Sequence, residues 1–159
     1  MSEALYSPCE RYRYLLTRRW GPGRALLYIM LNPSKATERA NDPTIERCER
    51  RARALGYEAV LIGNLFAWRE TSPALLRQAE DPVGAANGAA LERALAEADD
   101  VLAAWGVHGG WRGAGAEAER WLRERGVRLH TLGLTRDGHP RHPLYVGYAA
   151  PLLDWPEAV

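Results

Sequence analysis

The feature that most constrains this chain is a run of six large apolar residues, Leu26 to Leu31, that ends abruptly at Asn32-Pro33-Ser34. A short apolar run closed by turn residues predicts a buried strand, with side chains covered on both faces of a sheet. In open α/β sheets, ligands bind in the loops that leave the carboxyl ends of such strands. The pattern therefore places Asn32 and Ser34 where a binding site is expected.

Length, charge and cysteine content limit the class of protein. At 159 residues the chain is expected to form a single α/β domain, 1–159. The net charge of +1 excludes a generally basic protein, so a contact with nucleic acid must come from a local patch. Cys9 and Cys48 are isolated, which favours reduced thiols over a disulfide or an iron–sulfur centre. Without a signal-peptide pattern or a membrane-length apolar run, we expect a cytoplasmic protein and no membrane partner.

Hydrophobic periodicity predicts alternating strands and helices. Four strands, each followed by a helix or a polar loop, indicate a three-layer sandwich with a mainly parallel central sheet of about four strands. The alternating segment 11–16 is predicted to be a half-exposed strand. The turn at 20–23 would join it in an antiparallel edge hairpin to the first central strand. The four strands are expected at 26–31, 58–64, 100–105 and 127–132, and the helices at 42–55, 72–78, 87–98 and 114–125.

Polar and glycine-rich clusters follow the predicted strand ends. If the strands are parallel, the loops after Asn32, Asn64, Trp105 and Gly133 lie along one edge of the sheet. This asymmetry predicts a single cleft at that edge.

The first candidate in this cleft is Asn32-Pro33-Ser34. The asparagine amide and the serine hydroxyl can contact a ligand or a water molecule, and Pro33 favours an extended backbone at Asn32. The alternative is a plain turn, because Asn, Pro and Ser are the usual turn residues.

The second candidate is the segment that follows the second strand, with Asn64, Phe66, Trp68 and Arg69. Aromatic rings and a guanidinium stack on nucleic-acid bases, and arginine also binds phosphate. Equally, the two aromatics can be core or rim residues, with Arg69 paired to a nearby acid.

Histidines mark the remaining loops. His108 lies in the glycine-rich segment 106–110, which lacks the spacing of a Walker or dinucleotide motif, so no cofactor is expected. His139-Pro140-Arg141-His142-Pro143 is a stiff loop whose imidazoles can act as acid, base or hydrogen-bond donor. The alternatives are a solvated surface loop, or a metal site formed by His108, His139 and His142.

Six sequence blocks together resemble a bacterial and phage family known as domain of unknown function 1643. The resemblance extends from about Arg11 to Tyr145 and implies no function by itself. The blocks are Met30–Ser34, Asn41–Thr44, Asn64–Ala67, Asp81–Gly84, Ala104–Gly106 and Gly138–Tyr145.

A more distant resemblance is to the uracil-DNA glycosylase superfamily. Asn32-Pro33-Ser34 is similar to its first motif, although Met30 and Ser34 stand where that motif has glycines. The segment 64–71 is similar to the motif after the second strand, and His139-Pro140 or His142-Pro143 to the last, His-Pro-containing loop. The resemblance implies that Asn32 orients a water molecule and that one of the two loop histidines stabilises the leaving base. It also implies that Phe66 or Trp68 stacks on the base and that Arg141 faces phosphate.

These observations lead to three hypotheses. The first is a hydrolase of N-glycosidic bonds in a nucleoside or nucleic acid, with Asn32, His139 and His142 as catalytic candidates. The second is a non-catalytic module that binds a nucleotide or nucleic acid in the same cleft. The third is an enzyme acting on an unrelated small molecule.

Overall fold

One mixed β-sheet forms the centre of the molecule. The computed structural model describes residues 1–157. Within this range the sheet has seven strands in the order β1-β2-β4-β3-β5-β6-β7. The strands are β1 (Ser2–Tyr6), β2 (Arg13–Arg19), β3 (Ala25–Met30), β4 (Ala59–Asn64), β5 (Asp100–Ala103), β6 (Leu129–Thr131) and β7 (Leu153–Asp154).

The four inner strands are parallel, as the alternation of strands and helices predicts. β3 pairs in parallel with β4 on one side and β5 on the other, and β5 pairs in parallel with β6. Every residue of β3 is buried, because this strand has neighbours on both edges and helices over both faces. The predicted buried strand at 26–31 is thereby confirmed.

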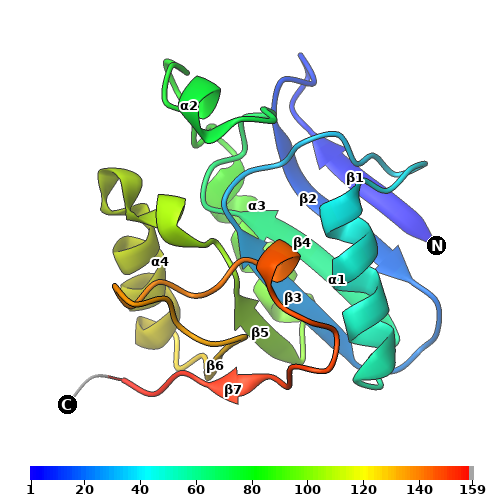
Figure 1. Ribbon diagram of the computed structural model, residues 1–159. Helices are drawn as coiled ribbons and strands as arrows, with labels where there is room; N and C mark the ends of the chain where they lie inside the picture. The colour runs from blue at the N-terminus through cyan, green and yellow to red at the C-terminus, as the bar shows by residue number, and fades with distance from the viewer. Residues whose placement is uncertain (158–159) are drawn as a thin grey trace.

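Helices cover the two faces of the sheet, and in Figure 1 α1 lies in front of it and α3 behind it. Tyr28 and Met30 of β3 pack with Ile45 and Cys48 of α1, whereas Leu27 packs on the opposite face. Each large apolar side chain buried in this way contributes about 1.5–3 kcal/mol. The helices are α1 (Pro43–Ala54), α2 (Pro73–Leu76), α3 (Asn87–Glu97) and α4 (Ala114–Glu124), with short 3-10 helices η1 (Val107–Gly113) and η2 (Pro143–Tyr145).

Local signals explain where α1 begins. Asp42 is its N-cap, and Oδ1 of the carboxylate accepts a hydrogen bond from the Ile45 amide at 2.9 Å. Pro43 occupies the first turn, where its missing N–H is not needed. The same carboxylate accepts a hydrogen bond from the Ala36 amide through Oδ2. Asp42 therefore joins the start of α1 to the loop that leaves β3.

The N-terminal strands differ from the prediction. β2 pairs antiparallel with β4, not with β3, and β1 pairs antiparallel with β2, so the edge hairpin consists of β1 and β2. The turn after β2 passes the start of β4, where the Trp20 and Gly21 amides donate to Glu58 O and the Glu58 amide donates to Arg24 O. The strand is also buried from Arg13 to Arg18, because α3 packs against it and the loop before α1 lies over it, where Arg13 and Arg18 donate to Ala36 O and Thr37 O.

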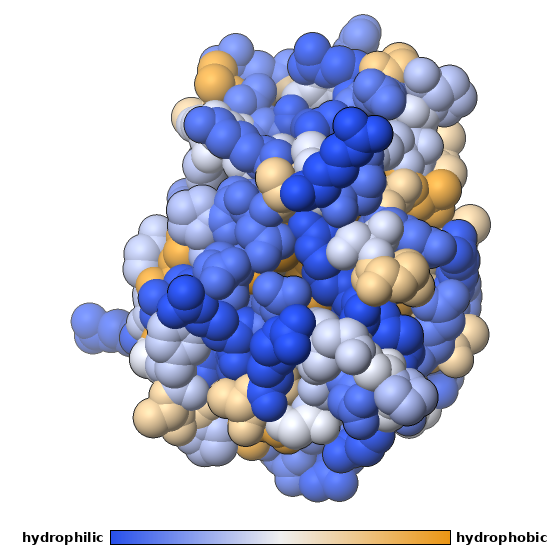
Figure 2. Space-filling view, turned by 90° about the vertical axis from the view of Figure 1, so that its right-hand side faces the viewer, coloured by the Kyte–Doolittle hydropathy of each residue, from blue (hydrophilic) through white to orange (hydrophobic). Residues whose placement is uncertain are grey.

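The surface is mostly polar on the face shown in Figure 2, where apolar side chains occur in scattered areas. No helix within residues 1–157 combines the length and hydrophobicity that crossing a bilayer requires.

Candidate functional site

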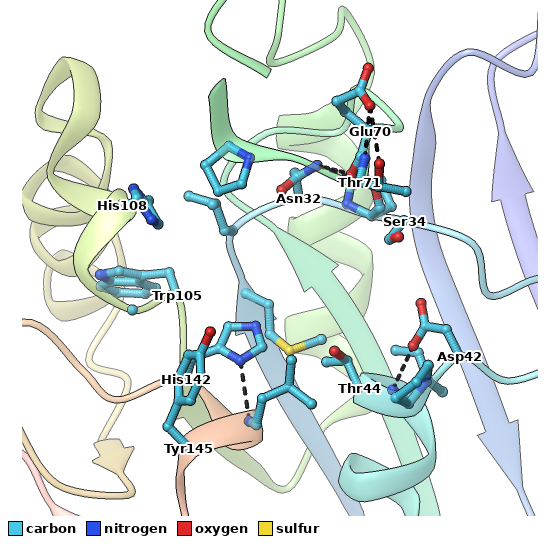
Figure 3. Close-up of a pocket in the computed structure, with 18 of the residues that line it drawn as sticks. Asn32, Ser34, Asp42, Thr44, Glu70, Thr71, Trp105, His108, His142 and Tyr145 are labelled. Carbon is cyan, nitrogen blue, oxygen red and sulfur yellow. Dashed lines mark hydrogen bonds between the residues drawn. The ribbon is translucent and has the colours of Figure 1, made fainter. Parts of the chain in front are cut away.

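A pocket of about 750 Å³ opens where the chain reverses direction across the sheet. From β3 the chain continues through α1 to β4, and from β5 it continues through α4 to β6. Because β4 and β6 lie on opposite sides of the neighbouring pair β3 and β5, the loops that leave this pair diverge. Such a divergence leaves a crevice at the carboxyl ends of the strands. Figure 3 shows the pocket between these loops, the start of α1 and η2. Its polar lining residues include Arg13, Asn32, Ser34, Lys35, Asp42, Thr44, Glu70, His108, Arg141 and His142.

Asn32 is held in one orientation by backbone carbonyls. Its Nδ2 donates to Glu70 O at 2.8 Å and lies 3.2 Å from Pro33 O and 3.4 Å from Trp68 O. Because carbonyls only accept hydrogen bonds, this environment assigns the nitrogen and oxygen of the amide. The nitrogen ties the loop after β3 to the loop after β4, which leaves Oδ1 as a hydrogen-bond acceptor for the pocket.

His142 presents the complementary group, a donor. Its Nδ1 accepts a hydrogen bond from the Leu144 amide at 3.2 Å, which places the proton of the neutral ring on Nε2. Burial lowers the pKa of His142 to about 4, although the Asp42 carboxylate acts in the opposite direction. In Figure 3 the other ring nitrogen faces the pocket. His142 is therefore a neutral hydrogen-bond donor at physiological pH.

A glycine permits the approach that places His142 there. Gly106 has a φ of +73°, and a Cβ at this position would lie 3.3 Å from Cβ of His142. The Gly106 amide donates to Pro140 O at 2.9 Å and so joins the end of β5 to the histidine-containing loop. A larger residue at 106 would be strained and would push against His142.

The depressed pKa of His142 predicts a pH-dependent stability. Between pH 6.5 and about 4 the unfolded chain binds a proton that the folded chain does not, so acidification through this interval destabilises the fold. The loss is at most about 3 kcal/mol. We expect His142→Gln to reduce this pH dependence, measured as the free energy of unfolding in urea at several pH values. Equal pH dependence in both proteins would contradict the neutral histidine.

The floor and mouth of the pocket are aromatic. Trp105, which follows β5, is buried and lines the floor, and a Cβ on Gly109 would lie 2.1 Å from its ring. The glycines of segment 106–110 therefore make room for a side chain of the protein itself. Tyr145 of η2 lines the opening and is 77% exposed, which leaves its ring free to contact a ligand.

The structure brings five of the predicted site residues to this pocket and leaves the other five elsewhere. Those that line it are Asn32, Ser34, His108, Arg141 and His142. Of the loop histidines, His139 does not line the pocket, and its ring lies beside Gly110, where a Cβ would be 3.1 Å from the ring. The sequence alone does not distinguish these two histidines, because each directly precedes a proline in the same loop.

The residues predicted after β4 do not line the pocket. Phe66 is buried against Trp111, and Trp68 packs edge-on against Tyr12. Arg69 donates to Glu10 O at 3.0 Å. Asn64 is fully buried, and neither of its amide atoms has a hydrogen-bond partner within residues 1–157. Phe66 and Trp68 are therefore core and rim aromatics, which was the alternative interpretation of this segment. Arg69 contacts a backbone carbonyl rather than the acid that this interpretation expected.

Several polar residues of the pocket carry no sequence signal that placed them there. Asp42 and Thr44 belong to the start of α1, and the N-cap signal of Asp42 located the helix without indicating that its first turn faces the cleft. Glu70 follows β4 at the point anchored by Asn32. Arg13 comes from β2, a strand that was expected to lie at the edge and half exposed.

The three-histidine metal hypothesis has no geometric support. His108 and His142 line the pocket, whereas His139 does not. In the part of the chain that the structure describes, no three His, Cys, Asp or Glu side chains are grouped so as to hold a metal ion.

Comparison with known proteins identifies a family but no activity. The family model described as "Protein of unknown function (DUF1643)" matches residues 13–144. No curated protein and no solved structure matches the chain, so the likeness to uracil-DNA glycosylases stays a prediction. The matched region extends from the start of β2 into η2 and includes every lining residue named above except Tyr145. Since this match spans most of its length, the chain belongs to the DUF1643 family.

Proposed function

We propose that this protein hydrolyses the N-glycosidic bond of a nucleoside or nucleotide bound in the pocket. The observation that carries the proposal is the pairing of a fixed acceptor with a neutral donor. Oδ1 of Asn32 and Nε2–H of His142 belong to loops from different strands and face the same space.

This pair matches the needs of the reaction. Cleavage breaks the bond between C1′ of the sugar and a base nitrogen; water supplies hydroxyl to C1′ and a proton to the base. A neutral imidazole donates a hydrogen bond to the negative charge that develops on the departing base, and its low pKa keeps it in that form. The Asn32 amide oxygen accepts a hydrogen bond from the attacking water and orients it. Glu70 lines the same wall, and its Oε1 accepts a hydrogen bond from the Thr71 amide at 2.9 Å, which leaves Oε2 to take the water's proton and pass it through solvent to the departing base.

Size and charge favour a small substrate over duplex DNA. The pocket volume of about 750 Å³ is within the range of roughly 300–1,000 Å³ for small-molecule sites. The chain has a net charge of only +1, whereas proteins that bind a duplex carry a strongly basic surface. The resemblance of Asn32-Pro33-Ser34 and the His-Pro loop to glycosylase motifs agrees with the same chemistry.

A second candidate function is binding of a nucleotide without turnover. Its support is the positive charge around the pocket, from Arg13, Lys35 and Arg141, together with the exposed ring of Tyr145. Arginine and lysine bind phosphate, and tyrosine stacks on a base. This candidate does not use the neutral state of His142, which is why we place it second.

Chromatographic detection of free base tests the two candidates together. We would incubate the protein with a panel of nucleosides, 5′-mononucleotides and oligonucleotides carrying modified bases, and treat the oligonucleotides with alkali to reveal abasic sites. Base release that depends on His142 supports hydrolysis. Binding measured by calorimetry without release from any substrate supports the second candidate. Neither binding nor release across the panel would contradict both.

A further inference from the structure

Arg13 is an unusual residue of the pocket because its charge is buried and poorly satisfied. The side chain is 1% exposed and still lines the pocket. Within residues 1–157 the guanidinium donates one hydrogen bond, from Nη1 to Ala36 O at 2.7 Å. Its Nε is buried without a partner. A guanidinium has five N–H donors, so the described residues use only a small part of its donor capacity.

A β-bulge directs Arg13 to this position. Tyr6 of β1 lies opposite Arg13, whereas Leu5 lies opposite Leu15, so Tyr14 is an extra residue in β2. Leu15 packs on the face covered by α3 and α4, and strict alternation would place Arg13 on that same face. The bulge instead turns Arg13 toward Ala36, which belongs to the loop before α1. Bulges are frequent next to functional sites because they re-aim side chains in this way.

The protein balances this charge only in part. Asp42 favours the protonated form of Arg13, but its carboxylate oxygens accept hydrogen bonds from the Ala36 and Ile45 amides. Arg18 and Arg69 oppose the charge, and burial lowers the pKa of Arg13 to about 10, so the group is still protonated at neutral pH. A buried charge without full pairing destabilises a fold. Its presence in a pocket points to an anionic ligand that completes the pairing.

We propose that Arg13 is the anion subsite of the pocket and binds the terminal 5′-phosphate of a mononucleotide substrate. Nη2 of Arg13 donates no hydrogen bond within residues 1–157 and, unlike Nε, is not enclosed, so it is the donor offered to a phosphate oxygen. Lys35 and Arg141 add positive charge to the same pocket. The choice of a nucleotide rests on the proposed function, while the anion subsite rests on Arg13 alone. An internal phosphodiester continues into further nucleotides on both sides, so a terminal phosphate suits a side chain at the buried end of a pocket.

The test compares each 5′-mononucleotide with its matched nucleoside by isothermal titration calorimetry. We expect the wild-type protein to bind at least one nucleotide more tightly than its nucleoside, and inorganic phosphate to compete with that nucleotide. Arg13→Met should weaken the affinity for the nucleotide about 10- to 100-fold and leave the affinity for the nucleoside within about twofold of wild type. Single-stranded oligonucleotides with and without a 5′-phosphate separate a terminal phosphate from a phosphodiester.

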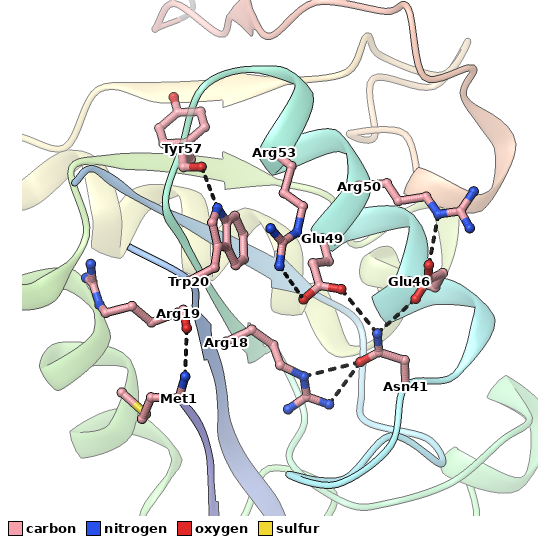
Figure 4. A network of polar contacts seen from close by, with 10 residues as sticks. All are labelled: Met1, Arg18, Arg19, Trp20, Asn41, Glu46, Glu49, Arg50, Arg53 and Tyr57. Atoms are coloured by element: carbon pink, nitrogen blue, oxygen red, sulfur yellow. Dashed lines mark hydrogen bonds and ion pairs between the residues drawn. The ribbon is translucent and has the colours of Figure 1, made fainter. Parts of the chain in front are cut away.

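Arg18→Met is a matched control. Arg18 is also a buried arginine of β2, but it donates to Thr37 O, Ala40 O and Asn41 Oδ1, and it does not line the pocket. Figure 4 shows its contact with Asn41. In urea unfolding we expect this control to lose stability while keeping the preference for nucleotides. Arg13→Met should retain or gain stability, because it removes an incompletely paired charge.

The outcomes separate this inference from the proposed function. If wild-type protein binds nucleotides and nucleosides equally, or if Arg13→Met keeps the preference, the anion subsite is wrong. If phosphate preference depends on Arg13 but no base is released, the subsite stands and the hydrolase proposal fails. If base is released equally from nucleosides and nucleotides, the hydrolase stands and the subsite fails. The wild-type comparison decides the matter even if the Arg13 variant does not fold.

Discussion

Replacing His142 with alanine should slow base release by about 10²- to 10³-fold, the effect of removing one donor that faces a developing negative charge. The physical reason is the geometry of the ring. Leu144 N–H occupies Nδ1, so Nε2–H is the donor that faces the pocket, and burial keeps the ring neutral. The measurement is kcat/KM for the best substrate of the panel. With wild-type protein, the rate should be insensitive to pH around 6.5, the ordinary pKa of histidine.

His139→Ala is the matched control for this variant. It removes the same side chain from the same loop, but the structure places that ring beside Gly110 and outside the pocket. We expect its rate to stay within about twofold of wild type. Equal losses in the two variants would show that the loop, rather than the His142 donor, matters for turnover. A loss in His139→Ala alone would contradict the arrangement of the pocket.

Replacing Asn32 with alanine should reduce base release by about 10²-fold or more, because a misplaced nucleophile carries a penalty of that size. The variant removes both halves of the amide. Loss of Oδ1 removes the acceptor proposed to orient water. Loss of Nδ2 leaves the carbonyl of Glu70 without its donor, which should lower the free energy of unfolding by about 1–3 kcal/mol. Both quantities are measurable on the same preparation, by chromatography and by urea titration.

Asn41→Ala separates these two effects. Asn41 belongs to the same loop and also ties it down, by accepting from Arg18 and donating to Glu46 at 2.9 Å, as Figure 4 shows. It does not line the pocket. We expect Asn41→Ala to cost stability without a comparable loss of rate. If both asparagine variants lose activity in proportion to their stability, Asn32 has a structural role only.

Strand and helix assignments were predictable because they depend on local periodicity. The apolar run at 26–31 and the capping signals at Asp42 and Pro43 are satisfied by their immediate neighbours, and β3 and α1 form there. Strand neighbours were less predictable. The turn after β2 contains ordinary hairpin residues, but β4 lies between β2 and β3, because pairing depends on contacts distant in sequence. The aromatics after β4 were equally ambiguous, since stacking on a ligand and packing in a core require the same residues.

By itself, the sequence determined the alternation of strands and helices, the edge of the sheet where the loops gather, and Asn32 as a residue of that edge. These follow from hydrophobic period and turn chemistry, which act over a few residues. Only the tertiary structure decided which histidine faces the pocket and that Arg13 is there at all. His142 depends on the close approach of Gly106, and Arg13 on a bulge set by pairing with β1. Both result from contacts between segments that are distant in the chain, so no local pattern could reveal them.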